Sequence, residues 1–308
     1  MDNRALAIIG EVKKAIAGKD EAITKVLTAI LAGGHVLMED IPGVGKTTMS
    51  LAFSRAMGLY FRRVQFTPDV VPSDITGFTM YDKNSGEFKY NPGATMCNFM
   101  LADEINRTSS KTQSSLLEVM QEGKVTVDGK TYKLPDPFIV MATQNPLGTA
   151  GTQMLPESQL DRFMIQISLG YPDTVSQIKI LRDRNSADPL LQVQPVVDKD
   201  DIIQMKNQVN LMYVDDKIYE YITALVEATR SHQYVKLGVS PRGALALSNM
   251  AKADAYVKGQ DFVTPENVQD VFKDVCSHRL VLEPKAQLAG LTKDDILSEI
   301  LETIKAAK

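Results

Sequence analysis

The chain has 308 residues, of which 44% are hydrophobic and 23% are charged, and its formal net charge is −4. These fractions are typical of a soluble globular protein, and the length suggests two domains. The negative net charge argues against a surface that follows nucleic acid throughout, and no stretch is long and apolar enough to span a membrane.

The N-terminal residues and the cysteine content indicate the cellular compartment. The first residues lack the organisation of a signal peptide. Only two cysteines occur, Cys97 and Cys276, which are too few for a disulfide framework. Neither the cysteines nor the three histidines show the spacing of metal ligands. We therefore expect a cytoplasmic protein without membrane insertion.

The first hundred residues alternate helical and strand patterns. Helical periodicity covers 6–16 and 21–31, and a strand pattern at 35–38 precedes a helical pattern at 48–57 and a strand pattern at 63–66. The stretch 67–96 is rich in turn residues. Within it, two short strand patterns flank Asn84-Ser85-Gly86, which predicts a hairpin.

The middle of the chain carries further strands and a second hairpin. An apolar strand pattern at 99–102 precedes a helix predicted over 110–121. Strand patterns at 124–127 and 131–134 bracket Asp128-Gly129, a strong two-residue turn signal. The continuous apolar run at 138–142 is typical of a strand buried on both faces, and 165–169 is the last predicted strand.

Beyond residue 173, capped helices replace the strands. Helix starts are predicted at Asp215, at Ser240 and Thr264, which are each followed by Pro, and at Thr292. Strands that alternate with helices predict an α/β domain with a parallel sheet over 1–183. The later helices predict a helical domain over 184–308.

The most informative stretch lies between the strand at 35–38 and the following helix and reads Pro42-Gly43-Val44-Gly45-Lys46-Thr47-Thr48. Glycines without a Cβ let backbone N–H groups surround a phosphate. Lys46 can contact the β- and γ-phosphates, and the Thr47 hydroxyl can bind Mg²⁺. Asp40 stands where the motif G-x-x-x-x-G-K-[ST] has its first glycine. The strand–turn–helix context predicts a phosphate-binding loop.

Residues with polar side chains directly follow the next two buried strands. Asp103 can hold Mg²⁺ through water, and Glu104 can orient or deprotonate an attacking water; the alternative is that both cap the following helix. Asn145 follows the strand at 138–142 and could contact the γ-phosphate, although Asn is also common in turns.

Two arginines are candidates for charge compensation. Arg162 stands in Leu160-Asp161-Arg162-Phe163, and Arg242 follows Ser240-Pro241. Arg242 falls in the first turn of a predicted helix, where the helix dipole disfavours a cation. A nucleotide phosphate facing that helix end would explain its position.

With these residues assembled, the chain resembles the MoxR family of AAA+ ATPases over nearly its whole length. The most specific segments are 34–47, 65–69, 101–107, 142–146, 155–157 and 159–163. MoxR-like chains commonly carry Glu-Asp before the proline of the loop, so Asp40 fits the family. The resemblance implies an AAA+ P-loop core with a parallel sheet and a C-terminal, all-helical lid domain.

The resemblance also implies roles for single residues. Gly43 to Thr48 correspond to the Walker A loop, Asp103 and Glu104 to Walker B, Asn145 to sensor 1, Arg162 to an arginine finger, Arg242 to sensor 2, and Ala17-Gly18-Lys19 to the segment against adenine. The regions 67–96 and 124–134 look like the helix-2 insert and the pre-sensor-1 hairpin, which would point toward the pore or face of a ring. For Arg107, a surface contact and a catalytic role stay open.

An arginine finger acting on a neighbour implies a homo-oligomer, expected to be a hexameric ring, with ATP and Mg²⁺ as cofactors. The family implies chaperone-like remodelling, assembly or metal-cofactor insertion, with partners that contain von Willebrand factor A domains. One alternative is a nucleic-acid-dependent motor, with Lys124, Lys130 and Lys133 contacting phosphate; the net charge and the lack of a DNA-binding module speak against it. Another alternative is a nucleotide-gated scaffold that hydrolyses ATP poorly. Glu104 argues against it, because such a scaffold would not need a residue that activates water.

Overall fold

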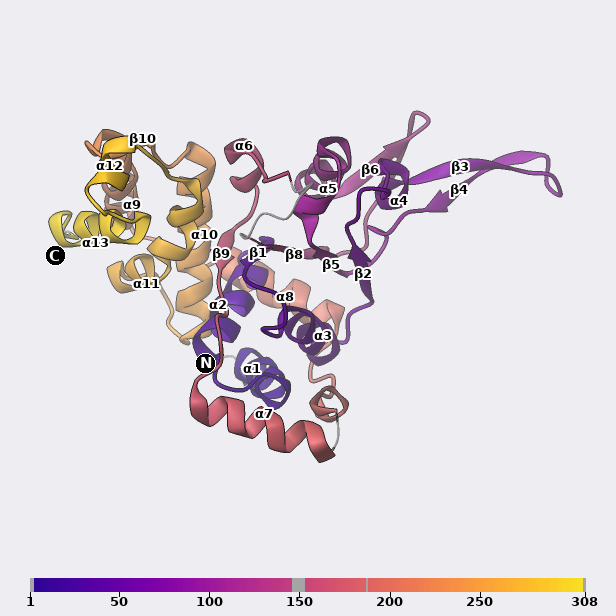
Figure 1. Cartoon of the computed structure of the whole chain (residues 1–308), viewed down its shortest axis with the longest axis horizontal. Coiled ribbons are helices and arrows are strands. Elements are labelled where there is room, and N and C mark those ends of the chain that lie inside the picture. The colour runs from indigo at the N-terminus through magenta and orange to yellow at the C-terminus, as the bar shows by residue number, and fades with distance from the viewer. Residues whose placement is uncertain (1–2, 146–152, 187, 307–308) are drawn as a thin grey trace.

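The computed structural model describes residues 3–145, 153–186 and 188–306. At its centre, five parallel strands form a sheet in the order β2-β5-β8-β1-β9 (Figure 1). These strands are β1 (Val36–Glu39), β2 (Phe61–Gln65), β5 (Phe99–Asp103), β8 (Ile139–Gln144) and β9 (Ile165–Ile167). The predicted α/β fold with a parallel sheet is confirmed.

The register brings the carboxyl ends of the strands to one edge of the sheet. Glu39 of β1 lies opposite Gln144 of β8, and Gln65 of β2 lies opposite Asp103 of β5. Strands β5 and β8 are buried along their whole length, as expected inside a parallel sheet. Ligands of open parallel sheets bind beyond this edge, so the loops that leave it form the first place to look for a site.

Helices cover both faces of the sheet. Those of the first half of the chain are α1 (Asn3–Ala15), α2 (Asp20–Leu31), α3 (Lys46–Ala56), α4 (Pro72–Thr76) and α5 (Ser110–Glu122). Successive strand residues point to opposite faces: Val36 and Met38 of β1 pack in one buried cluster with α1, α2 and α3, whereas Leu37 packs in another with α4 and α5.

The C-terminal part is a bundle of helices. It comprises α9 (Asp216–Ser231), α10 (Pro241–Val257), α11 (Pro265–Cys276), α12 (Pro284–Leu288) and α13 (Lys293–Thr303). The predicted starts are confirmed, because Asp215, Ser240, Thr264 and Thr292 are the N-caps of α9, α10, α11 and α13. Among the described residues, none of the helices has the length and apolarity needed to cross a membrane.

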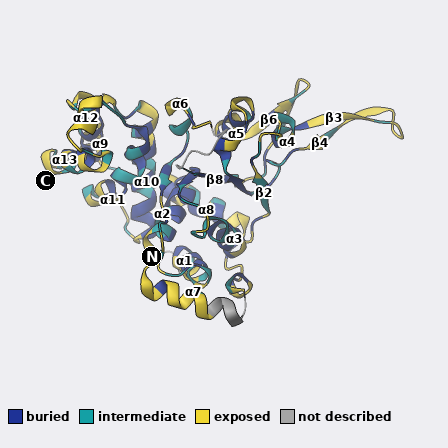
Figure 2. Cartoon of the chain, viewed as in Figure 1, coloured by how far each residue is buried: buried dark blue, intermediate teal, exposed yellow. Residues whose placement is uncertain are grey.

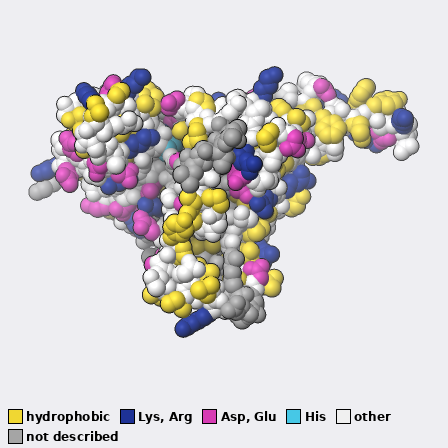
Figure 3. Space-filling view, viewed as in Figure 1, with side chains coloured by type: hydrophobic (Ala, Val, Ile, Leu, Met, Phe, Trp, Pro, Cys, Tyr) yellow, Lys and Arg dark blue, Asp and Glu magenta, His cyan; other side chains and the backbone are white. Residues whose placement is uncertain are grey.

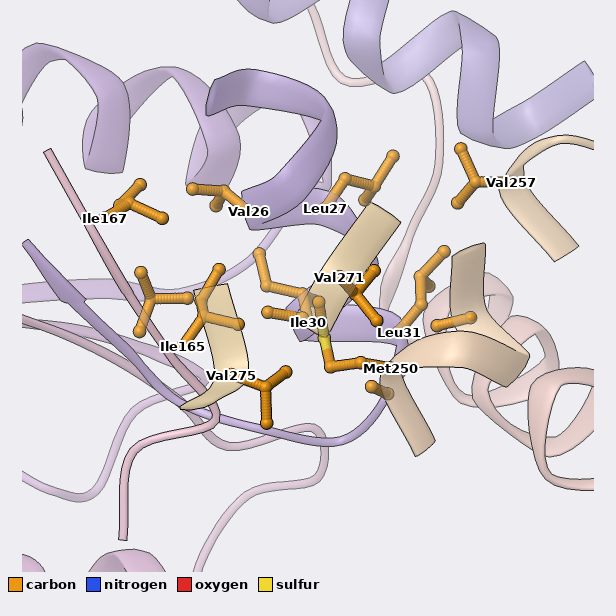
Figure 4. Packing of buried hydrophobic residues seen from close by; sticks show 14 of the residues in the cluster. Val26, Leu27, Ile30, Leu31, Ile165, Ile167, Met250, Val257, Val271 and Val275 are labelled. Atoms are coloured by element: carbon orange, nitrogen blue, oxygen red, sulfur yellow. The ribbon is translucent and has the colours of Figure 1, made fainter. Parts of the chain in front are cut away.

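Helix α2 joins the sheet to this bundle. Figure 4 shows its apolar side chains between the last strand of the sheet and two helices of the bundle. The contacting residues are Val26, Leu27, Ile30 and Leu31 of α2, Ile165 and Ile167 of β9, Met250 and Val257 of α10, and Val271 and Val275 of α11. Because one apolar cluster runs through both parts, the bundle is packed against the core.

Several elements between and within these parts were not predicted. They are α4 and α12, given above, α6 (Glu157–Leu160), α7 (Thr174–Ser186), α8 (Lys199–Asn210), the short helices η1 (Ile105–Arg107), η2 (Pro189–Gln192) and η3 (Ser277–Arg279), and a ribbon of β10 (Val235–Leu237) with β11 (Val281–Leu282). Strands this short are invisible to periodicity. The division between residues 183 and 184 falls inside α7 and stays a prediction.

Both predicted hairpins are present: β3 (Gly77–Asp82) with β4 (Glu87–Pro92), and β6 (Lys124–Val127) with β7 (Lys130–Lys133). Asp128 and Gly129 both have positive φ, 47° and 75°, as the two-residue turn requires. Figure 1 shows β3 and β4 as an arm that projects from the body, and Figure 2 shows that its residues are largely exposed. The rings of Tyr90 in β4 and Tyr132 in β7 stack with their centroids 4.0 Å apart. The two hairpins therefore pack against each other at the base of the arm.

Candidate active site

The loop between β1 and α3 has the backbone that an anion site needs. Gly43 and Gly45 adopt φ of 87° and 103°, and Gly45 is the N-cap of α3. A Cβ at Gly43 would meet no atom within 4 Å, so its φ, and not lack of space, favours glycine. Helix α3 begins at Lys46, two residues before the predicted start, so the N–H groups of Lys46 and Thr47 belong to its unpaired first turn.

Lys46 is held against the loop. Its ammonium group donates to the carbonyl oxygens of Asp40 at 2.5 Å and Ile41 at 3.2 Å. Burial lowers the pKa of Lys46, while the carboxylates of Asp40, Asp103 and Glu104 oppose that shift. Asp40, whose carbonyl holds Lys46, donates its N–H to the Gln144 carbonyl at the end of β8, and Thr143 of β8 holds Asp103. The predicted lysine and acids therefore lie at the same edge of the sheet.

Asp103, at the end of β5, is fixed by two neighbouring strands. The Thr143 hydroxyl of β8 donates to Asp103 Oδ1 at 2.7 Å, and the Arg63 guanidinium of β2 donates to Oδ2 at 2.7 Å. Asp103 is only 8% exposed. A carboxylate and the Thr47 hydroxyl beside a phosphate loop are a donor set that suits Mg²⁺, which takes one or two protein oxygens and completes its shell with phosphate and water.

Glu104 is held in a backbone conformation that is rare for a non-glycine residue. Its φ is 56°, and its N–H donates to Thr143 Oγ1 at 2.8 Å. Its side chain accepts hydrogen bonds at Oε2 from Gln65 Nε2 and Arg107 Nη1, both at 2.7 Å. Arg107 therefore makes a surface ion pair with Glu104. Whether it also has a catalytic role stays a prediction.

The helix-capping explanation of the two acids is wrong. Helix α5 is capped by Ser109, whose side chain accepts from the Thr112 N–H, and Glu104 makes no side-chain cap bond to the short helix η1. Asp103 points instead to Thr143 and Arg63. The acids are therefore part of the polar cluster at the sheet edge.

Asn145 lies where β8 leaves the sheet and is half-buried. Its carbonyl oxygen accepts from Asn106 Nδ2 at 3.2 Å, beside the Asp103-Glu104 pair. Because β8 and β5 are neighbours, Asn145 and the two acids follow adjacent strands, and the contact of Asn145 with the γ-phosphate stays a prediction. Pro146, the last residue of the quoted motif, lies outside the described residues.

A cavity of about 300 Å³ adjoins the phosphate loop. It is lined by residues 14–17 and 19, by residues 42–45 and Thr48, and by Tyr171, Pro172, three residues of α7 and Pro189. Ala17 and Lys19 of the predicted adenine segment thus line the same cavity as the loop, whereas Gly18 does not, and the role of the segment stays a prediction. Gly18 has a φ of 70°, and a Cβ there would lie 2.0 Å from Ser176 Oγ, so α7 approaches this segment closely.

The two predicted arginines lie together at α5 and do not line this cavity. Arg162 Nη1 donates to the Leu117 carbonyl at 3.0 Å, and Arg242 Nη2 to Gln121 Oε1 at 3.4 Å. Leu117 and Gln121 are one helical turn apart and share a face of α5. Arg162 Nε is buried and, within the described part of the chain, has no hydrogen-bond partner.

The sequence reasoning missed Arg63, Gln65 and Thr143. Arg63 and Gln65 alternate along β2 and so share one face, which was a visible signal. Their contact with the acids depends on β2 lying next to β5, and strand order is a property of the assembled sheet.

The chain is similar to known proteins over nearly its whole length. Residues 35–165 match the ATPase family associated with various cellular activities (AAA), and residues 227–300 match the AAA lid domain. The chain is 46% identical to the uncharacterized protein YeaC of Bacillus subtilis over 96% of this chain and 93% of that one. It is 38% identical to chaperone MoxR1 of Mycobacterium tuberculosis, over 96% and 80% of the two chains. A crystal structure of a candidate ATPase from Cytophaga hutchinsonii superposes with a TM-score of 0.92 at 38% identity, covering 99% of this chain and 96% of that one.

Proposed function

This chain belongs to the MoxR family of AAA+ ATPases. We therefore propose that it hydrolyses ATP with Mg²⁺ at a site that a second subunit completes. The AAA+ core and the lid domain are those of the family, and membership supports ATPase activity. The observation that carries the proposal is the meeting of the glycine loop, Lys46 and the Asp103-Glu104 pair at one edge of the sheet.

Each residue has a role that follows from its chemistry. Gly43, Gly45 and the first turn of α3 present N–H groups to the phosphates, and Lys46 adds a positive charge to the β- and γ-phosphates. Thr47 and Asp103 would hold Mg²⁺, which when bound neutralises phosphate charge. Asn145 would contact the γ-phosphate.

Glu104 would act as the base that orients and deprotonates the attacking water. In this structure its Oε2 accepts hydrogen bonds from Gln65 and Arg107, and these contacts occupy the oxygen that an attacking water would need. We propose that one or both contacts open before hydrolysis.

Arg162 and Arg242 would serve the active site of the neighbouring subunit. Both donate hydrogen bonds to residues of α5, and neither lines the cavity at the phosphate loop of its own chain. Cationic guanidinium groups stabilise the charge that spreads over the transferred phosphoryl group, and a finger supplied by a partner is worth roughly three to five orders of magnitude in turnover. We therefore propose a ring, expected to be hexameric, with the active sites between its subunits.

The energy of hydrolysis would remodel other proteins. One curated relative is named a chaperone, which supports this class of function. We propose clients or partners with von Willebrand factor A domains, and assembly or metal-cofactor insertion as the outcome. The exposed arm of β3 and β4 is the element best placed to reach such a client (Figure 3).

The ATPase proposal is tested by phosphate release from the purified protein with Mg-ATP. Glu104→Gln should bind ATP but lower turnover by about 100-fold or more, because the water loses its base. Lys46→Ala should lose ATP binding itself. Full turnover in Glu104→Gln would contradict the assignment of the base.

The client is identified by trapping. Glu104→Gln, held in its ATP state, is recovered from native lysate, and Lys46→Ala serves as the matched control that cannot hold nucleotide. A partner with a von Willebrand factor A domain that is retained with Mg-ATP and lost with ADP would support remodelling. Retention of nuclease-sensitive DNA or RNA in its place would favour the nucleic-acid motor.

A further inference from the structure

Asp40 stands at the position where the phosphate-loop motif has glycine, and its side chain is fully engaged. It is 5% exposed. One carboxylate oxygen, Oδ1, accepts from Ser168 Oγ at 2.8 Å and from the Gly170 N–H at 3.0 Å, and Oδ2 accepts from the Leu169 N–H at 2.5 Å. Its φ is not positive, so the backbone at this position does not demand glycine.

The segment that Asp40 holds, residues 168–170, leads directly into one wall of the cavity. Gly170 turns the chain with a φ of 58°, and Tyr171 and Pro172 then line the cavity together with residues 14–17. Lys19, which also lines the cavity, donates to the Tyr171 carbonyl at 2.9 Å. The cavity beside the phosphate loop is where the nucleoside of a bound nucleotide would lie.

The backbone of Asp40 belongs to the phosphate loop itself. Its N–H donates to the Gln144 carbonyl at 3.2 Å, and its carbonyl accepts from Lys46 Nζ at 2.5 Å. Asp40 therefore makes hydrogen bonds to the end of β8, to Lys46 of the phosphate loop, and to the segment 168–170 that leads into the cavity wall. A carboxylate so close to a triphosphate would repel it, and the three donors that surround the carboxylate reduce that repulsion.

We propose that Asp40 is a positioning residue that ties the nucleoside-binding wall to the phosphate loop. The inference rests on the proposed nucleotide binding. A wall fixed to the loop receives the nucleoside at a set distance from the phosphates, so less ordering is left to occur on binding. Asp40 thereby adds affinity for the nucleoside part of ATP and little for the triphosphate part.

The test is calorimetric titration of two ligands, Mg-ATP and Mg-tripolyphosphate, into the full chain carrying Glu104→Gln. In that background, Asp40→Gly restores the glycine of the motif. It should weaken ATP binding by about tenfold or more, because it removes three hydrogen bonds to a charged acceptor. Tripolyphosphate binding should change by less than about threefold.

Ser168→Ala is the matched partial variant, since it removes one of the three donors and leaves the carboxylate in place. It should weaken ATP binding less than Asp40→Gly does, again without effect on tripolyphosphate. Thermal unfolding of each variant shows whether it is folded.

Three outcomes would overturn the inference. The first is unchanged ATP affinity in Asp40→Gly. The second is a loss of affinity in Asp40→Gly that is equal for ATP and tripolyphosphate. The third is a loss of ATP affinity that is equal in Asp40→Gly and Ser168→Ala. If the Glu104→Gln parent, with Asp40 intact, binds neither ligand, the proposed nucleotide binding itself fails and the inference fails with it.

Discussion

A single buried imidazole joins the sheet to α5. His35 Nδ1 accepts from the Val140 N–H at 3.0 Å, and its Nε2 lies 3.1 Å from the Met120 carbonyl oxygen. The amide can only donate and the carbonyl can only accept, so these partners assign a neutral ring with its proton on Nε2. Burial lowers the pKa of His35 to about 4.

Acidification should therefore destabilise the fold through His35. The unfolded chain takes up a proton near pH 6.5, whereas the folded one resists it until about pH 4, so stability is present above the unfolded value and is lost as the pH falls. The loss from this residue should reach about 3 kcal/mol of unfolding free energy by pH 4.

Urea unfolding at several pH values measures the loss, with His35→Gln as the comparison. His278, also buried with a lowered pKa, acts in the same direction, so some pH dependence should persist in the variant. His35→Gln should be less stable at neutral pH yet lose less on acidification. If the free energy of unfolding falls equally steeply with pH in both proteins, the assignment to His35 is wrong.

At the scale of elements, a buried ion pair ties the segment before β9 to the C-terminal bundle. Arg279 of η3 is 4% exposed, and its guanidinium donates to Asp161 Oδ1 at 2.8 Å and to the Phe163 carbonyl at 2.6 Å. Ser240, the N-cap of α10, donates to Asp161 Oδ2 at 2.9 Å. The helix that carries Arg242 and the segment that carries Arg162 are thus held by one carboxylate.

Replacing Arg279 by Met should lower the free energy of unfolding by about 3–5 kcal/mol, because Asp161 and the carbonyl oxygens would stay buried without their partner. Denaturant unfolding measures the effect. Arg162→Met is the matched control, because that half-buried side chain makes one hydrogen bond within the described part of the chain. Its replacement should cost about 1 kcal/mol. Equal losses in the two variants would show that the ion pair is not the anchor.

At the scale of the whole molecule, the two arginines and the phosphate loop lie on different parts of one subunit. In the proposed arrangement, one chain would supply the phosphate loop of one active site and the arginines of the next. Closed rings are the usual result of such head-to-tail contacts when the rotation between subunits closes.

Mixing two inactive variants should therefore restore activity. Glu104→Gln keeps its arginines but lacks the base, and Arg162→Ala keeps its base but lacks the finger. In mixed assemblies with equal amounts, about a quarter of the interfaces should combine an intact base with an intact finger. Phosphate release should rise to a similar share of wild-type turnover, whereas a site complete within one chain predicts no recovery.

Much of the architecture could be predicted because its signals are local. The apolar strand patterns, the Asp128-Gly129 turn and the N-caps at Ser240 and Thr292 depend on neighbours within a few residues, and each is confirmed. The ribbon of β10 and β11 and the helix α7 were missed. Strands of two or three residues show no period, and α7 has little hydrophobic asymmetry to reveal a buried side.

The sequence by itself determined the chemistry: the glycine loop with Lys46 and Thr47, and the acids Asp103 and Glu104 after an apolar strand. Only the tertiary structure decided which side chains meet those acids. Arg63 and Gln65 reach them because β2 pairs with β5, and Thr143 reaches them because β8 lies on the other side. Such contacts depend on strand order and packing, which join residues far apart in the chain and leave no local pattern.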